Sequence, residues 1–195
     1  SMSVRVWRES GYSKGALSFL VQDIDRKRKP VAMIALYNPP VSSRLNRYGL
    51  QWSHDILGWS EVEVARLWRK YGFVAVGGDF NWRLFETFGR ATEDKRSNVS
   101  DANSRSEMAR QWHMRTHLRP LYGQRGQQPG VFTSRTGNGM AEVDGVSVCD
   151  KMLPGWSVEA LRPPEWDLYS SKAGVHRPVG CTIVSPLIVA EAVVG

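Results

Sequence analysis

The stretch 74–81, Val-Ala-Val-Gly-Gly-Asp-Phe-Asn, places a carboxylate and an amide side chain directly after a short apolar run. That run is rich in β-branched residues and followed by glycines, which predicts a strand with both faces covered. Gly77 and Gly78 predict a tight turn, so Asp79 and Asn81 would emerge at the strand's C-terminal end, where open sheets usually place their chemistry. We interpret this as an active-site loop, although Asp and Asn also bend turns without catalysing anything.

Three further residues are candidates for a site, each with a simpler alternative. Asp144 lies between valines in a strand-like segment, where a carboxylate is expensive to bury without a partner. His176, beside an Arg-Pro pair, is either that partner or an ordinary loop histidine. Tyr37 ends another apolar run and is either a site residue or a strand aromatic with its hydroxyl at the surface.

His113 and His117 have the spacing that aligns two imidazoles on one helix face. No carboxylate or third ligand accompanies them in the sequence, so a solvated or DNA-facing helix is favoured over a zinc site. The formal net charge of +7, with arginine predominating, suits a surface that contacts phosphates.

At 195 residues, with 42% hydrophobic and 23% charged residues, the chain has the size and composition of one globular domain. We expect that domain to span 3–195, with 1–2 a remnant of tag cleavage. The apolar run 183–194 is interrupted and too short to cross a bilayer. The two cysteines lie in apolar contexts, which favours buried free thiols and an intracellular protein, nuclear if it acts on DNA.

The strands expected from apolar patterns are 16–21 and 31–37, joined as a hairpin, then 73–76, 131–134, 141–149, 156–161 and 179–184, with 131–134 and 141–149 forming a second hairpin. Helices are expected over 46–57 and 60–71, and from Ser104 through Arg115. Ser60 with Glu63, and Ser104 with Glu107, have capping-box spacing, while 87–103 is polar enough for a surface loop. This order predicts an α/β sandwich of two mixed β-sheets flanked by helices.

Four segments, 34–39, 78–81, 141–148 and 175–179, resemble motifs of the endonuclease/exonuclease/phosphatase superfamily in their order, spacing and strand contexts. The short loop before Gly130 and the segment 132–135 look most like the endonuclease domains of non-LTR retrotransposons. The resemblance implies metal-dependent hydrolysis of a phosphodiester, typically in DNA, with Mg²⁺ or Mn²⁺ as cofactor.

The same resemblance implies a role for each candidate. Asp79 matches the aspartate that activates water, and Asn81 the asparagine beside it. His176 matches the histidine that contacts the scissile phosphate, and Asp144 the aspartate that orients it and keeps it charged. Tyr37 falls where the family has a tyrosine near the phosphate.

The sequence departs from the family pattern at the metal. The family's metal-binding glutamate lies on strands before the segment that Gly11 begins to match, and those strands are absent from this sequence, so the domain is expected to be incomplete at its N-terminus. Val175 stands where the family has an aspartate, and valine cannot ligate a hard cation. Glu9 and Glu142 are the nearby acidic residues that could substitute, and neither matches a motif.

We therefore expect a retroelement-like DNA endonuclease domain that is weak or inactive as this isolated chain. Losing metal ligands at a phosphoryl centre costs roughly a thousandfold in rate or more. The alternatives are a non-catalytic module on the same fold that binds nucleic acid or protein, and a phosphatase for a small molecule. An oligomer or partner chain is expected to cover the sheet surface that the absent strands leave open.

Overall fold

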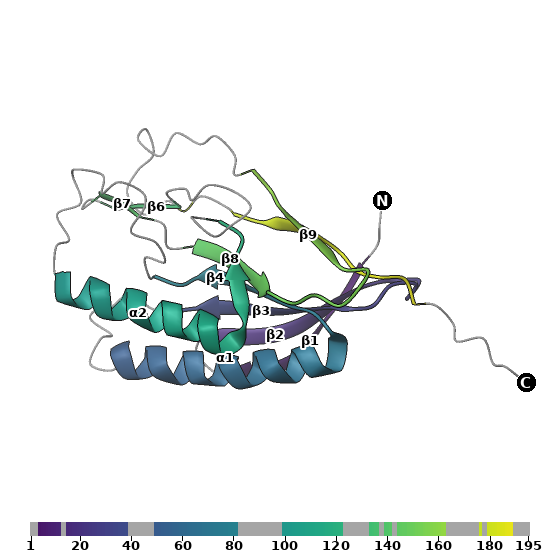
Figure 1. The fold of residues 1–195 in the computed structure, drawn as a ribbon, viewed down its shortest axis with the longest axis horizontal. Helices are drawn as coiled ribbons and strands as arrows, with labels where there is room; N and C mark the ends of the chain where they lie inside the picture. Colours follow the sequence, from purple (N-terminus) through teal and green to yellow (C-terminus); the bar gives the residue numbers. More distant parts are fainter. Residues whose placement is uncertain are drawn as a thin grey trace, which may run out of the picture.

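The computed structural model describes residues 4–12, 15–38, 49–81, 99–122, 133–136, 139–141, 144–162, 176 and 179–188. A six-stranded mixed sheet in the order β1-β2-β3-β4-β8-β5 forms its centre (Figure 1). These strands are β1 (Val4–Tyr12), β2 (Ala16–Asp23), β3 (Val31–Tyr37), β4 (Val74–Asp79), β5 (Leu118–Pro120) and β8 (Asp144–Cys149). Only the β3–β4 pair runs parallel within this sheet. The predicted hairpin of β2 and β3 is confirmed, and β1 is a strand that the apolar pattern did not predict.

Two helices, α1 (Gly49–Tyr71) and α2 (Val99–Thr116), cover one face of the sheet (Figure 1). The predicted helices 46–57 and 60–71 are one helix, because Ser60 does not cap: its hydroxyl donates to the Leu57 carbonyl at 2.8 Å and accepts the Trp112 indole N–H at 2.9 Å. A buried contact with α2 therefore explains the serine. Likewise α2 begins at Val99, so the predicted loop is wrong over 99–103 and Ser104 lies inside the helix.

A smaller antiparallel sheet of β9 (Ser157–Ala160) and β10 (Cys181–Val184) lies on the other side of the central sheet (Figure 1). Trp156 joins the layers by stacking on Phe73, with ring centroids 4.4 Å apart. Strands were predicted at 156–161 and 179–184, and β9 and β10 confirm both. The mixed central sheet, the second sheet and the helices agree with the expected α/β fold class. The second predicted hairpin is wrong, because β6 (Ser134–Thr136) pairs with β7 (Gly139–Ala141), while β8 joins the central sheet.

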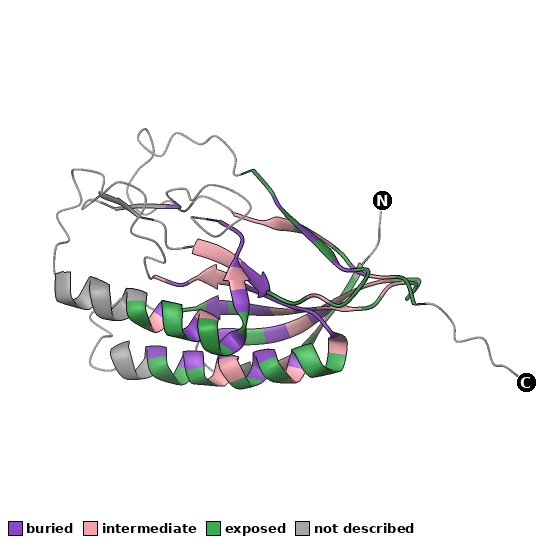
Figure 2. Cartoon of the chain, viewed as in Figure 1, coloured by how far each residue is buried: buried purple, intermediate pink, exposed green. Residues whose placement is uncertain are grey.

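Buried and more exposed residues alternate along much of β2 and β3 (Figure 2), because successive side chains of a strand project to opposite faces. Those directed towards the helices are buried, including Leu20, Ile34 and Leu36. On the opposite face Leu17 is 37% and Tyr37 46% exposed. The segment 74–76 of β4, by contrast, is fully buried, as predicted for a strand covered on both faces.

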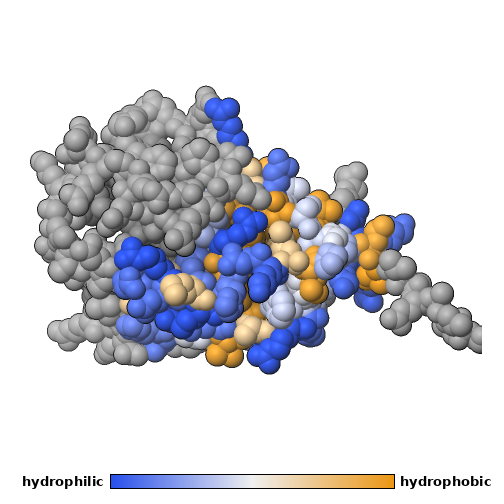
Figure 3. Space-filling view, viewed as in Figure 1, coloured by the Kyte–Doolittle hydropathy of each residue, from blue (hydrophilic) through white to orange (hydrophobic). Residues whose placement is uncertain are grey.

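The outer surface of the helices is mostly hydrophilic, with single hydrophobic residues among the polar ones (Figure 3). Val62 and Met114 are such residues, at 71% and 74% exposure. Among the described residues no helix is long and apolar enough to cross a membrane. Cys149 and Cys181 are free thiols in β8 and β10, as predicted, but only Cys149 is buried, whereas Cys181 is partly exposed.

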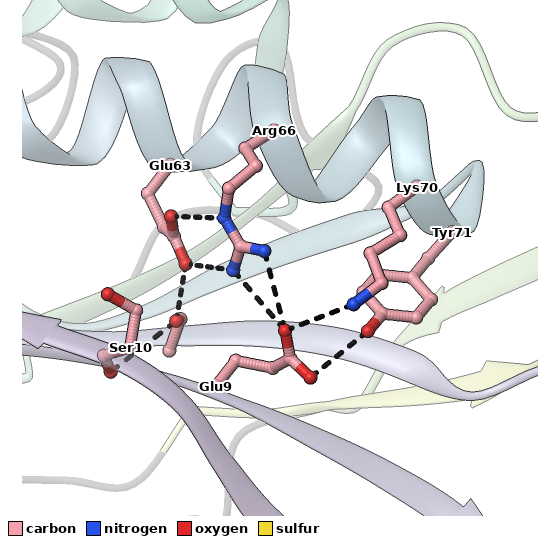
Figure 4. A network of polar contacts seen from close by, with 7 residues as sticks. Glu9, Ser10, Glu63, Arg66, Lys70 and Tyr71 are labelled. Carbon is pink, nitrogen blue, oxygen red and sulfur yellow. Dashed lines mark hydrogen bonds and ion pairs between the residues drawn. The ribbon is translucent and has the colours of Figure 1, made fainter.

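A polar network ties β1 and β2 to α1 (Figure 4). The β1–β2 register shifts between Arg8 and Ser10, so Glu9 is the extra residue of a β-bulge. Its carboxylate contacts Arg66 and Lys70 at 3.4 and 3.6 Å and accepts the Tyr71 hydroxyl at 3.1 Å. Glu9 thus links the edge strand β1 to α1 through these three contacts.

Glu63 forms the buried half of this network (Figure 4). Its carboxylate accepts the Ser18 hydroxyl at 2.5 Å and the Arg66 guanidinium at 2.6 Å. The hydrogen bond from Arg66 is the main cause that lowers the pKa of Glu63, and the one from Ser18 lowers it further, against the effect of burial. The glutamate predicted to complete a capping box is instead an ion-pair partner in the middle of the helix.

Candidate active site

Three candidate residues form one row across the central sheet. Tyr37 pairs with Asp79 in the parallel β3–β4 ladder, and Asp79 pairs with Asp144 in the antiparallel β4–β8 ladder. Directly paired residues project to the same face of a sheet. The side chains of Tyr37, Asp79 and Asp144 therefore lie side by side on the face turned away from α1.

His176 completes this group from a distant part of the sequence. Its Nδ1 atom lies 2.8 Å from Oδ2 of Asp144, and the two side chains are 45% and 18% exposed. The backbone N–H of Asp144 donates to the hydroxyl of buried Thr133 at 2.9 Å, which fixes the start of β8. The expected pairing of the aspartate with the histidine is therefore present, with the aspartate more buried than its partner.

The Asp79 carboxylate stands in an environment that disfavours its charge. Burial is the main cause that raises its pKa, and the negative charge of Asp144 raises it further. The backbone N–H of Asn81 donates to Asp79 Oδ1 at 3.0 Å, which acts in the opposite direction, as does the charge of His176. A carboxylate with a raised pKa accepts a proton more readily than an ordinary aspartate does, which suits a general base.

Asn81 is held in a strained turn by a buried asparagine. Its φ of 48° lies in the left-handed region, which asparagine tolerates better than most residues. The Asn81 side-chain amide donates to the Asn38 carbonyl at 2.8 Å, and the Asn38 amide donates to the Phe80 carbonyl at 2.9 Å. Ser53 of α1 donates to Asn38 Oδ1 at 2.6 Å. Through Asn38, the helix fixes the turn that carries Asp79 and Asn81.

Gly77 and Gly78 lie within β4, so the tight turn predicted for them is wrong and the chain turns after Asp79. Gly78 has a φ of +154°, and a Cβ atom built on it would lie 1.8 Å from the Leu36 carbonyl oxygen. The glycine therefore permits close approach of β3 and β4 next to the site.

Oxygen and nitrogen ligands of Asp79, Asp144 and His176 all lie within 4.8 Å of one another, so this group could hold a metal ion. Two carboxylates suit Mg²⁺ or Mn²⁺, which commonly completes its coordination with waters and substrate phosphates. Glu9 does not join the group, because Arg66 and Lys70 hold it at α1. Glu142, the other acidic residue expected as a possible substitute ligand, and Val175, the expected departure from the family pattern, lie outside the described residues.

The sequence interpretation missed the supporting residues. Asn38 was visible as a polar residue between an apolar strand and two prolines, and its burial at 1% exposure marks it as structural. Thr133 gave no comparable signal. The expectation for His113 was wrong: its ring contacts the Ala109 carbonyl and the Ser147 hydroxyl, both at 2.9 Å, and burial lowers its pKa. His117 lies beyond the end of α2, exposed.

No protein-family model matches the chain, and no curated protein matches it. Solved structures do. The human Nocturnin catalytic domain, with bound sulfate, aligns with 95% of this chain and 59% of its own at a TM-score of 0.51 and 10% identity. A Neisseria 3′ phosphatase, NExo, bound to a product DNA hairpin, aligns with 94% of this chain and 71% of its own, at a TM-score of 0.49 and 14% identity.

The inositol polyphosphate 5-phosphatase domain of SPsynaptojanin aligns with 96% of this chain and 55% of its own, at a TM-score of 0.46 and 13% identity. The chain thus spans between 55% and 71% of the length of these three proteins. At such low identities the similarity concerns the fold alone. The comparison with Nocturnin, at a TM-score of 0.51, is the one that supports the fold assignment. The chain has the endonuclease/exonuclease/phosphatase fold that its four sequence segments predicted.

Proposed function

We propose that this chain is a metal-dependent phosphodiesterase-type endonuclease domain that acts on DNA. The observation that carries the proposal is the row Asp79–Asp144 with His176 bonded to Asp144. Two carboxylates and an imidazole, with ligand atoms within 4.8 Å of one another where β4 ends and β8 begins, supply a base, a cation and oxygen ligands for a phosphate reaction.

In this proposal Asp79 takes a proton from the attacking water, whose oxygen forms the new bond to phosphorus. The ester bond on the opposite side of phosphorus breaks, and the released oxygen leaves as an alcohol after it gains a proton. Protonated His176 donates a hydrogen bond to the phosphate oxygen on which negative charge grows. Asp144 orients the imidazole and favours its charged form. Asn81 steadies the water, and Tyr37 borders the phosphate.

Asp79 and Asp144 are the residues that would hold a divalent cation. When bound, Mg²⁺ or Mn²⁺ supplies Lewis-acid stabilisation of the phosphate, worth several kcal/mol of transition-state energy. The family's glutamate is not among the matched residues, so we expect weak activity from the chain alone.

DNA is proposed as substrate on two grounds. The chain carries a formal net charge of +7, which favours a polyanionic partner. The loop before Gly130, the segment 132–135 and the following strand with Asp144 look most like the endonuclease domains of non-LTR retrotransposons, which supports a retroelement origin and nuclear action. The NExo structure holds a DNA hairpin product, an example of this fold with DNA.

Nicking of supercoiled plasmid tests the proposal. We expect slow conversion to the open circle with Mg²⁺ or Mn²⁺, and none with EDTA. DNA binding without cleavage under either metal would instead support the non-catalytic module.

The expected partner chain stays a proposal, as does a single domain over 3–195. The apolar side chains Val6 and Leu17, which are 60% and 37% exposed, support a partner chain, because both project from the sheet face opposite α1. Size-exclusion chromatography with light scattering tests it: a dimer for the chain and a monomer for Leu17→Gln are expected, and a monomeric parent chain contradicts it.

A further inference from the structure

A cleft of about 500 Å³ lies at the end of β4 opposite the candidate active site. We call it the distal cleft, and the residues that define its chemistry are Lys29, Trp68, Arg69, Tyr71 and Leu153. Gly72, just before β4, lines the cleft, whereas Asp79 ends the strand at the active site. Seven residues of extended chain at about 3.3 Å each separate the two places by about 23 Å.

Three exposed cations line this cleft, and two of them, Lys29 and Arg69, come from different elements. Lys29 comes from the β2–β3 connection, where its backbone N–H donates to the Pro186 carbonyl at 2.9 Å. Arg69 lies in the last turn of α1, and its Nε donates to the Ala65 carbonyl at 3.2 Å. Within the described part of the chain, no carboxylate forms an ion pair with either residue. The helix dipole favours a cation at the Arg69 position but gives no reason for Lys29 beside it.

Several other cations in the described part of the chain, including Lys70 of the same cleft, are paired with carboxylates of the fold. Arg66 pairs with Glu9 and Glu63, and Arg115 pairs with Glu61 at 2.7 Å. Lys70 contacts Glu9 at 3.6 Å and lies over the Tyr71 ring. Lys29 and Arg69 therefore keep their charge for a partner outside the fold.

An aromatic side chain, Trp68, lines the same cleft. Trp68 is 39% exposed, although a tryptophan buries a large apolar area when it packs into a core. Its indole N–H points to the Lys151 carbonyl at 3.4 Å, which restrains the ring. A restrained, exposed indole beside cations is a surface on which an unpaired base can stack while phosphates contact the cations.

We propose that the distal cleft binds single-stranded nucleic acid, with the backbone phosphates at Lys29 and Arg69 and a base on Trp68. This site is separate from the catalytic row, because about 23 Å of strand lies between them. The proposal goes beyond the nuclease function and does not depend on it, because binding without cleavage is measured.

The test is fluorescence anisotropy of labelled oligo(dT) of about ten nucleotides in EDTA, which prevents metal-dependent cleavage. Lys29→Glu with Arg69→Glu is expected to weaken binding at least tenfold at low salt. The slope of log affinity against log salt should fall by about 1.4, since each phosphate contact on a single strand contributes about 0.7. The control Arg5→Glu with Arg8→Glu makes the same net change at exposed positions on β1.

Trp68 separates base stacking from charge. Trp68→Ala is expected to lose about tenfold in affinity for oligo(dT), whereas Trp68→Phe, which keeps an aromatic ring, retains most of it. Duplex DNA of equal length should be insensitive to Trp68→Ala, because its bases are already stacked. Equal losses from the cleft pair and the β1 pair, or no effect of Trp68→Ala on oligo(dT), would overturn the proposal, provided that thermal melts show each variant folded.

Discussion

His176 Nδ1 lies 2.8 Å from Asp144 Oδ2, and Asp144 is itself the direct cross-strand neighbour of Asp79. One aspartate thus joins the histidine to the carboxylate that we propose as the base. The three residues are separated by at least 32 positions in the sequence and meet only because β4 pairs with β8.

This relationship predicts non-additive losses of activity. His176→Ala and Asp144→Asn should each lower the cleavage rate by about 10²- to 10⁴-fold, the usual contribution of a positioned acid or base. Because Asp144 acts largely through His176, the double variant should lose much less than the product of the two losses. Single-turnover rates for the three variants measure this, and fully multiplicative losses would show that the residues act independently.

Asp79→Asn is predicted to stabilise the fold while it removes activity. Burial and Asp144 raise the pKa of Asp79 in the folded state, so its ionisation costs stability as pH rises through that value. The asparagine carries no charge and keeps an oxygen for the Asn81 N–H. Its melting temperature should exceed that of the parent at pH 7, with the difference vanishing below the ordinary pKa of aspartate. A lower melting temperature at pH 7 is the contrary result.

Gly78→Ala should destabilise the chain by about 3 kcal/mol or more, because the new Cβ meets the Leu36 carbonyl oxygen and the φ of +154° is strained for alanine. Gly58→Ala is the matched control, since nothing lies within 4 Å of its Cβ position in α1. The control should gain about 0.5–1 kcal/mol from helix propensity. Urea unfolding compares the two variants, and similar effects would contradict the close packing of β3 and β4.

Glu63→Ala is predicted to cost about 2 kcal/mol or more, because it leaves the buried Ser18 hydroxyl with only the Ser10 carbonyl at 3.5 Å as acceptor and Arg66 without its main partner. Glu107→Ala removes another glutamate paired with an arginine three positions away, but at the surface, and should change little. The lowered pKa of Glu63 means that its contribution is present above the ordinary glutamate pKa and is lost as pH falls through the folded value. Urea titrations at pH 7 and pH 3 measure both effects, and equal costs for the two variants at pH 7 would refute the role of the buried pair.

Local patterns in the sequence predicted most strands and the residue types of the site. The alternation of apolar and polar residues in β2 and β3 and the apolar run of β4 are properties of short segments. Such strands can therefore be predicted from the sequence alone. Ser60 and Glu63 show where this fails. Their spacing matches a helix cap, but their partners Trp112 and Ser18 are 52 and 45 residues away, and only tertiary packing shows that α1 continues through them.

For the site, too, the residue types could be predicted from the sequence, whereas their arrangement in space could not. The residues Tyr37, Asp79, Asp144 and His176 were identified through family motifs, but their alignment in one row depends on the β4–β8 register, which no local pattern specifies. Gly77 and Gly78 were assigned to a turn because glycine pairs usually mark turns. In the structure they lie within β4, where a close approach to β3 requires the second of them.

The most direct test of the central claim is Mg²⁺-dependent nicking of supercoiled plasmid by the chain and by Asp79→Asn, with DNA binding measured in parallel. We predict that the substitution lowers the nicking rate at least about a hundredfold and leaves DNA affinity unchanged or slightly higher, because one negative charge is removed. Nicking at the parent rate by a folded Asp79→Asn variant would contradict the assignment of the Asp79–Asp144–His176 group as the active site.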